Sequence, residues 1–311
     1  MNNKKVKIIL CTFNGESYIK EQLNSLLNQT YSNFSINIYD DQSNDNTLTI
    51  IEDFSRRHPK INISIVIREK NLGYYKNFMK ALLDLNLEDD LIFLCDQDDV
   101  WLPTKIEQVI DKYKKNNLPF LYFSTRYIVF KNLEIKKIAP KKTDYPITFF
   151  HLFFQNLAGG NTIAINKLLL SKIIKFNNLF TYTIHDWQII AIASSIRNCI
   201  FYFDKTPSIL YRQHSNAAIG SNDNLKDYYN KIYLTLSFQY KKEISKRLNF
   251  FLLNKENLLP EHHKFLKQIK KFREMHFFHR LINIRQISFC KYRYNIFKRS
   301  LWFIFILFGL F

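Results

Sequence analysis

The sequence lacks the residues and motifs that would mark several classes of protein. Its four cysteines, Cys11, Cys95, Cys199 and Cys290, are far apart and show no paired spacing. This argues against a zinc site or a disulfide framework and favours a reducing compartment. The chain contains no P-loop, GxGxxG, HExxH or nucleophile-elbow sequence, and no internal repeat. A bound phosphate would therefore have to be held by a metal and side chains.

Long hydrophobic runs are also missing. The apolar run after Lys5 is short, is interrupted by Lys7 and lacks a small-residue cleavage site, so no signal peptide is expected and the protein should stay in the cytoplasm. The last eleven residues, 301–311, are intensely apolar. A spanning helix needs about 20 such residues, so this tail is expected to lie on a membrane rather than cross it. The alternative is that the tail folds back as a core helix.

The excess of positive charge is concentrated in one part of the chain. The formal net charge is +18, and residues 221–311 hold 18 Lys/Arg against 6 Asp/Glu, which gives +12 for this segment alone. Such an asymmetry indicates an anionic partner surface. Four basic residues, Lys291, Arg293, Lys298 and Arg299, precede the apolar tail, as expected for docking on an anionic membrane. Nucleic-acid binding is the rival interpretation, but no signature of it accompanies the charge, so we expect no nucleic acid.

One stretch in the first half of the chain concentrates the acids. Residues 91–95 are five uninterrupted apolar residues, which predict a strand buried on both faces. They run directly into Asp96, Asp98 and Asp99. Carboxylates so close together repel one another, and Mg²⁺ or Mn²⁺ bound by one or two of them together with substrate phosphates would offset that repulsion. The alternative is an acidic turn that caps a helix beginning near Pro103.

The first 124 residues alternate between strand and helix patterns. Apolar runs at 6–12, 35–40, 61–68, 91–95 and 120–124 predict strands, and residues spaced by three and four between them predict helices. This alternation indicates a parallel sheet. Ligands of such sheets bind at the carboxyl ends of the strands, and three of these ends carry polar clusters: residues 12–14, 40–43 and 96–99. Each cluster could be a capped loop, but together they predict a site.

The second half offers a different set of candidates. Residues 127–138 look like further strand or ribbon, 149–154 are densely aromatic, 163–165 predict a short strand, and Gly159-Gly160 is the only Gly-Gly pair. Asp186 opens an apolar helical stretch, where an acid also acts as a simple cap. Arg212 and His214 then follow a short strand pattern, which places a cation and an imidazole after the strand.

These motifs together resemble the family 2 glycosyltransferases with the GT-A fold, and in particular bacterial enzymes of O-antigen and capsule assembly described as rhamnosyltransferase-like. The resemblance rests on six phrases in order across residues 6–215: CTFNGESY at 11–18, LNQTY at 27–31, DDQSND at 40–45, NLG at 71–73, DQDDVW at 96–101 and YRQH at 211–214. It does not reach residues 221–311.

The resemblance implies a fold and a domain division. The fold would be an α/β, Rossmann-like, mostly parallel sheet flanked by helices, with a helical basic C-terminal extension. Residues 1–220 would form the GT-A domain, with a nucleotide-sugar-binding half at 1–124 and an acceptor and catalytic half at 125–220. Residues 221–311 would be the basic, aromatic, membrane-associating region.

The resemblance also implies roles for individual residues. An inverting enzyme would move one sugar from a nucleotide diphosphate donor, dTDP-rhamnose or a UDP-hexose, to a hydroxyl of a lipid-linked or polysaccharide acceptor. Asp98 and Asp96 would hold Mg²⁺ or Mn²⁺, with Asp99 in support, and Asp186 would be the base. The donor nucleotide would contact Thr12, Asn14, Asp40, Asp41, Asn71 and Asp96. The diphosphate would contact Arg212 and His214, and the acceptor side would include Gly160, Asn161, His185 and Trp187.

One position departs from the family pattern. Where many relatives have Glu-Asp, this chain has His185-Asp186, so the base is retained while the role of its neighbour is open.

Two alternative functions keep the same fold. A nucleotidyltransferase acting on sugar phosphates would have a glycine-rich basic loop after its first strand, which the turn at Phe13 to Glu16 does not provide. A catalytically inactive sugar-nucleotide binder is disfavoured by the retained Asp98 and Asp186. The expected location is the inner face of the cell membrane.

Overall fold

The computed structural model describes residues 4–113, 117–140, 147–181, 184–213, 238–276 and 278–279 of the chain. Its centre is a seven-stranded sheet with the strand order β10-β6-β9-β4-β1-β2-β3. The strands are β1 (Val6–Thr12), β2 (Phe34–Asp40), β3 (Asn62–Ile67), β4 (Leu91–Asp96), β6 (Phe120–Ser124), β9 (Ala164–Asn166) and β10 (Ile200–Asp204). All neighbouring pairs are parallel except those made by β9, which lies antiparallel between β4 and β6.

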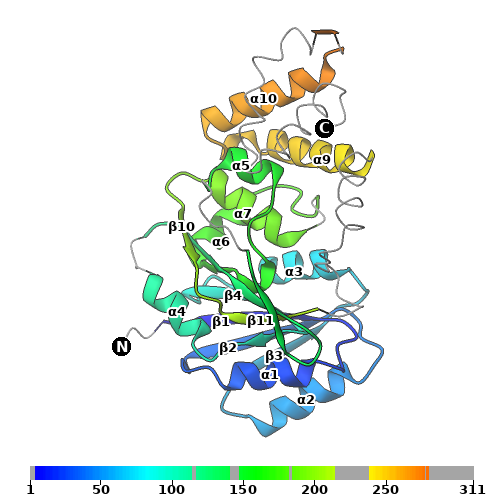
Figure 1. The fold of residues 1–311 in the computed structure, drawn as a ribbon, viewed down its shortest axis with the longest axis vertical. Coiled ribbons are helices and arrows are strands. Elements are labelled where there is room, and N and C mark those ends of the chain that lie inside the picture. Colours follow the sequence, from blue (N-terminus) through cyan, green and yellow to red (C-terminus); the bar gives the residue numbers. More distant parts are fainter. Residues whose placement is uncertain are drawn as a thin grey trace.

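Helices cover both faces of this sheet (Figure 1). One face packs on α1 (Ile19–Leu27), α2 (Thr47–Arg57) and α4 (Lys105–Lys112). Alternate residues of the strands supply each face, as the pleat requires: Ile8 and Leu10 belong to this cluster, whereas Ile9 belongs to the cluster on the other face. The second face packs on α3 (Tyr74–Leu83), α5 (Phe149–Phe154), α6 (Lys167–Ile173) and α7 (His185–Ser195).

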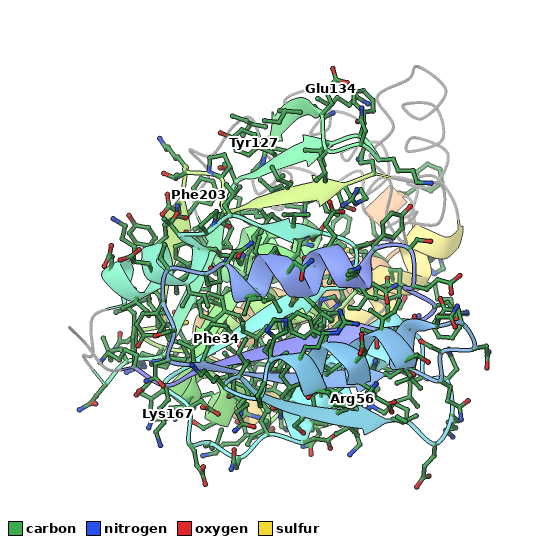
Figure 2. The ribbon with its side chains drawn as sticks, turned by 90° about the horizontal axis from the view of Figure 1, so that it is seen from below. Phe34, Arg56, Tyr127, Glu134, Lys167 and Phe203 are labelled. Atoms are coloured by element: carbon green, nitrogen blue, oxygen red, sulfur yellow. The ribbon has the colours of Figure 1, made fainter. Side chains whose placement is uncertain are left out.

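A smaller sheet stands beside the large one and has the order β5-β11-β7-β8. Its strands are β5 (Val100–Trp101), β7 (Arg126–Val129), β8 (Ile135–Ala139) and β11 (Ile209–Arg212). Figure 2 shows Tyr127 and Glu134, which mark the β7–β8 hairpin, at the opposite end of the view from Arg56 and Lys167. Because β5 comes from the acid-rich stretch and pairs with β11, this sheet ties the first half of the chain to the second.

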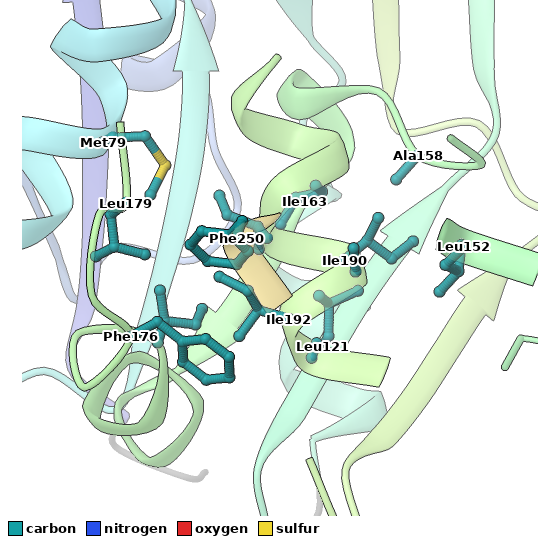
Figure 3. Packing of buried hydrophobic residues seen from close by; sticks show 14 of the residues in the cluster. Met79, Leu121, Leu152, Ala158, Ile163, Phe176, Leu179, Ile190, Ile192 and Phe250 are labelled. Carbon is teal, nitrogen blue, oxygen red and sulfur yellow. The ribbon is translucent and has the colours of Figure 1, made fainter. Parts of the chain in front are cut away.

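The C-terminal helices belong to the larger core. Helices α9 (Phe238–Leu253) and α10 (Pro260–Glu274), separated by a short 3₁₀ turn at Lys255–Asn257, lie against α5 and contribute buried residues to its cluster. Phe250, for example, stacks on Phe176 with ring centroids 5.9 Å apart, and Figure 3 shows Phe250 among the aliphatic side chains of α7. The predicted division near residue 220 lies outside the described residues, and the domain boundaries stay a prediction.

The predicted fold class is confirmed: the structure is a mostly parallel α/β sheet flanked by helices. The sequence left α5, α6, β5 and β10 unassigned. Within the described residues, no helix has the length and apolarity needed to cross a membrane. The apolar tail at 301–311 lies outside those residues.

Candidate functional site

Three parallel strands bring the predicted polar clusters to one edge. In the register of the sheet Thr12 of β1 pairs with Asp40 of β2, and Cys11 pairs with Asp96 of β4. The carboxyl ends of neighbouring parallel strands lie at the same edge, so the expectation that these clusters meet is confirmed.

A pocket of about 440 Å³ opens at this edge. The volume lies within the range of roughly 300–1,000 Å³ that is usual for small-molecule sites. Nine of the predicted site residues line it: Thr12, Asp41, Asn71, Asp96, Asp98, Gly160, Asn161, His185 and Asp186. Asn14, Asp40, Trp187 and Arg212 do not line it, and His214 lies outside the described residues.

Asp41 joins the β2 loop to the loop before α3. Its carboxylate accepts hydrogen bonds from the backbone N–H groups of Leu72 (2.7 Å) and Gly73 (2.8 Å), and its carbonyl oxygen accepts one from the Asn71 side chain (3.0 Å). Gly73 has a φ of +79°, a conformation that strongly favours glycine. The NLG phrase is thus explained locally, because it shapes the backbone that Asp41 holds.

Asp40 and Asn14 build the loops behind the pocket. Asp40 is fully buried, and its carboxylate accepts hydrogen bonds from the Thr12 hydroxyl (2.8 Å), the Ser43 N–H (2.8 Å) and the Ser43 hydroxyl (2.6 Å). The Asn14 side-chain oxygen accepts a hydrogen bond from the Asn44 N–H (2.8 Å), and the Asn14 N–H donates to the Ser43 hydroxyl (2.9 Å). These contacts place both residues behind the pocket rather than in its lining.

Asp96 and Asp98 project into the pocket from the end of β4, and Gln97 between them braces the loop. Gln97 accepts a hydrogen bond from the Phe13 N–H (2.8 Å) and donates one to the Phe13 carbonyl (2.9 Å). Burial, together with the charges of Asp98 and Asp186, raises the pKa of Asp96 to about 7. Closely spaced carboxylates of this kind favour a bound cation.

The pair suits a small divalent cation. Mg²⁺ typically takes one or two carboxylates and completes its coordination with substrate phosphates and water. In the part of the chain that the structure describes, no group of three or more His, Cys, Asp or Glu side chains is arranged to hold a metal ion. The protein would therefore supply two carboxylates, and the substrate and water would supply the remaining ligands.

Asp99 is buried beneath these two acids and organises the chain around them. It is fully buried, its carboxylate accepts hydrogen bonds from the Asn161 side chain and the Arg212 N–H (3.2 Å), and burial raises its pKa well above the usual range. Nearby, the Lys105 ammonium donates to the Asn161 carbonyl (2.9 Å), and burial lowers its pKa to about 7. This arrangement connects the acid-rich loop directly to the Gly-Gly-Asn turn.

Asp186 lines the same pocket from a different element, the first turn of α7. Its carboxylate accepts hydrogen bonds from the backbone N–H of Gly160 (3.1 Å) and from its own neighbour Trp187 (2.6 Å). Only glycine fits at position 160, because a Cβ there would lie 2.4 Å from Nε2 of His185. The Gly-Gly turn thus allows the backbone to approach both residues and orient the carboxylate.

His185 is buried beside this carboxylate, stacked on Phe78 with ring centroids 4.3 Å apart. Within the described residues neither of its ring nitrogens has a hydrogen-bond partner. Burial lowers the pKa of His185, and the negative charge of Asp186 only partly opposes that shift. The ring is therefore neutral at pH 7 and carries one donor and one acceptor that no described residue uses.

Two other predicted site residues make contacts away from the pocket. Trp187 donates from its indole to the Leu152 carbonyl (2.6 Å) and lies under the Arg247 guanidinium. Arg212 is 3 % exposed; it pairs with Glu21, donates to the Asp98 carbonyl (3.0 Å) and the Lys131 carbonyl, and lies over the Tyr18 ring. Its role at a diphosphate stays a prediction.

Sequence reasoning missed Tyr74, Phe78, Arg126 and Asn156, which line the pocket, and it gave no role to Phe13, Gln97 and Tyr211, which line it from within the predicted clusters and motifs. Arg126 could have been found by the rule that identified the acids, since it follows the carboxyl end of the strand at 120–124. Tyr74 and Phe78 have helical spacing and gave no signal that distinguishes a pocket wall from core.

Comparisons with known proteins agree with this geometry. The model of the family described as "Glycosyl transferase family 2" matches residues 7–174 of this chain. The dTDP-rhamnosyl transferase RfbG of Shigella flexneri is 35 % identical over 246 residues, which cover 77 % of this chain and 83 % of that protein. The glucosyltransferase WfgD of Escherichia coli, which acts on GlcNAc-diphosphoundecaprenol with UDP-Glc, is 30 % identical over 55 % of this chain and 64 % of its own length.

Solved structures show the same fold at low sequence identity. TarS of S. aureus in complex with UDP-GlcNAc superposes with a TM-score of 0.54 at 18 % identity, over 97 % of this chain and 81 % of that one. The mannosyltransferase PcManGT of Pyrobaculum calidifontis, solved with GDP-Man and Mn²⁺, gives 0.52 at 11 % identity, over 99 % and 86 %. The family match selects glycosyl transfer over the nucleotidyl-transfer alternative. The chain belongs to glycosyl transferase family 2, has the GT-A fold and is a glycosyltransferase.

Proposed function

We propose that this protein is an inverting, metal-dependent glycosyltransferase that moves a sugar from a nucleotide diphosphate donor to a hydroxyl of a growing cell-surface polysaccharide. The observation that carries the proposal is one pocket lined by two acids at the end of a strand, Asp96 and Asp98, and by a third acid, Asp186, from the first turn of a helix. The relatives named above support dTDP-rhamnose or a UDP-hexose as the donor.

The two sets of acids suit different tasks. On the strand side, a divalent cation held by Asp98 and Asp96 would neutralise charge on the leaving diphosphate. Asp41 and Asn71 line the same side and can contact the nucleotide, with Thr12 and the loops of Asp40 and Asn14 supporting them. On the helix side, Asp186 is held by the Gly160 N–H with its carboxylate in the pocket.

The reaction requires one base. As the acceptor oxygen attacks the anomeric carbon, its proton passes to Asp186, the bond from that carbon to the phosphate oxygen breaks, and the electron pair stays on the diphosphate. Attack from the face opposite the leaving group inverts the anomeric configuration. Retention by double displacement would need a second carboxylate that acts as a nucleophile. The single displacement that inverts the anomeric centre needs none.

A screen of nucleotide sugars tests the proposal. Purified protein with Mg²⁺ or Mn²⁺ and a lipid-linked sugar acceptor is expected to release nucleoside diphosphate from one donor of a panel that includes dTDP-rhamnose, UDP-glucose and UDP-GlcNAc, and EDTA should stop the release. Absence of release from every donor, or full turnover in EDTA, would contradict it. An inactive sugar-nucleotide binder would bind a donor in the same panel without turning it over.

We further propose that the protein acts at the cytoplasmic face of the membrane, where lipid-linked acceptors are presented. The support is the sequence of the tail, in which basic residues precede an apolar run; each basic residue near an anionic leaflet adds about 1 kcal/mol. Deletion of residues 288–311 should release the protein from anionic vesicles and spare transfer to a soluble acceptor analogue. A truncated protein that still floats with the vesicles would show that the tail is not the anchor.

A further inference from the structure

The described lining of the pocket has four carboxylates and a single permanent positive charge. Among the described residues that line it, Asp41, Asp96, Asp98 and Asp186 are acidic, and Arg126 is the only lysine or arginine. A pocket with this charge repels a phosphate unless cations offset the acids. The guanidinium of Arg126 is therefore the one protein group of the described lining that can attract an anionic ligand by its charge.

The structure holds this guanidinium in a defined plane. Arg126 is the first residue of β7, and its guanidinium lies 4.2 Å from the centroid of the Tyr211 ring. Its Nη1 donates to the side-chain oxygen of Asn161 (3.1 Å). A Cβ at Gly159 would lie 1.8 Å from that nitrogen, so the glycine makes room for the arginine. A guanidinium fixed in this way can offer paired N–H donors to phosphate oxygens.

The position of Arg126 is next to the acids of the strand side. Its positive charge is one of the influences that lower the pKa of Asp96, against the larger effects of burial and of Asp98 and Asp186. By contrast, Arg212, the cation expected from the sequence, is bound to Glu21 and to backbone carbonyls and does not line the pocket. The two arginines therefore differ in their surroundings, and of the two only Arg126 lines the pocket.

We propose that Arg126 binds the diphosphate of the nucleotide-sugar donor and stabilises it as the leaving group, while Arg212 serves as a structural link between the acid-rich loop and α1. This inference rests on the proposed function, since it names a further residue of the same site. It assigns the contact with the diphosphate to Arg126, which lies outside the six motif phrases found in the sequence.

The test compares nucleotide binding by the full-length protein and its Arg126→Met variant. Calorimetry is run with UDP, dTDP and GDP and with the matching monophosphates, first with Mn²⁺ and then in EDTA, which isolates the contribution of the protein. The wild type should prefer diphosphate over monophosphate in both conditions. The variant should lose about 10- to 100-fold in diphosphate affinity, as expected for a charge-assisted hydrogen bond, with monophosphate affinity unchanged.

Two further variants separate charge from fold. Arg126→Lys should recover part of the loss, because it restores the charge without the fork. Arg56→Met, an exposed arginine on α2 whose side chain is 76 % exposed, is the matched control and should bind every nucleotide as the wild type does. An equal loss of monophosphate and diphosphate affinity in Arg126→Met would indicate a merely structural role and overturn the inference.

The remaining outcomes distinguish the inference from the proposed function. If the wild type binds none of the nucleotides, the proposed function fails. If the wild type prefers diphosphates and Arg126→Met keeps that preference, only the inference fails. A second set of titrations compares the affinity for an acceptor sugar linked to a diphosphate with the affinity for the same sugar as an alkyl glycoside. If Arg126→Met loses the preference for the diphosphate-linked acceptor and keeps the preference for nucleoside diphosphates, Arg126 lies at the acceptor and its assignment to the donor is overturned.

Discussion

The two sides of the pocket are built in different ways. On the side of β1, β2 and β4, polar side chains bind one another and the backbone: Asp40, Asp41, Asn14 and Gln97 each make at least two hydrogen bonds. On the side of α7, Asp186 is held by two backbone N–H groups, but His185 leaves both ring nitrogens without a partner within the described residues. The first side is held in place by its own hydrogen bonds, whereas the second contains an imidazole whose polar atoms a ligand can satisfy.

The comparison suggests why the two sides differ. A nucleotide is a constant part of a donor, so a prearranged set of loops can bind it at low entropic cost. Acceptors vary among polysaccharides, and an unsatisfied imidazole beside the proposed base Asp186 can select for a hydroxyl in the right place. Substitutions on the two sides should therefore separate stability from activity.

The largest expected contrast is between two acids at the same edge of the sheet, Asp98 after β4 and Asp40 at the end of β2. Asp98→Ala should abolish transfer and change stability little, because its carboxylate would serve the cation and diphosphate. Asp40→Ala should cost about 3 kcal/mol of stability, because three hydrogen bonds to a fully buried carboxylate are lost. Chemical unfolding and donor turnover of both variants provide the check. The acids do not cap the following helix, because α4 has Thr104 at its N-cap and β5 intervenes; a destabilised Asp98→Ala would instead give this carboxylate a structural role in the acidic turn.

The next effect concerns the proposed base. Asp186→Asn can still accept the hydrogen bond from the Gly160 N–H but cannot take a proton. Turnover should fall by at least about 10²-fold while nucleotide affinity is retained. Asp111→Asn, a change at an exposed position of α4, is the control and should turn over normally. Equal losses of affinity and rate in Asp186→Asn would place Asp186 in the donor site.

The smallest effect sharpens the comparison on the side of α7. His185→Phe keeps the stacking on Phe78 and removes two buried polar atoms, so it should stabilise the protein by about 1 kcal/mol at pH 7 while raising the KM for the acceptor. The donor KM should not change. His263→Phe on α10 should leave both KM values as in the wild type. A variant that is more stable and transfers normally would show that His185 has only a packing role.

The same variant has a predicted pH dependence. Burial lowers the pKa of His185 below its ordinary value of 6.5, so the unfolded chain takes up the proton at a higher pH than the folded one. The wild type therefore loses stability as pH falls through 6.5 towards the folded pKa. Because phenylalanine does not titrate, the stability advantage of His185→Phe should grow as pH is lowered through this window. An advantage that shrinks in this window would contradict the sign.

Local patterns predicted the sheet and its acids because both depend on short-range signals. Residues 91–99 carry a buried strand and its acidic end in one stretch, and register then brings Asp96 beside β1. The antiparallel insertion of β9 was not predictable, because three apolar residues carry no information about the direction of pairing. Likewise, the partner of Arg212 is Glu21, 191 residues away in sequence, and no local pattern could show that the cation was already bound.

The stereochemistry of the product tests the central claim most directly. Nuclear magnetic resonance can compare the anomeric configuration of the new linkage with that of the donor found in the nucleotide-sugar screen. Direct attack assisted by the single base Asp186 predicts an inverted anomeric centre. A product with retained configuration would contradict the account, because direct displacement with one base cannot give retention.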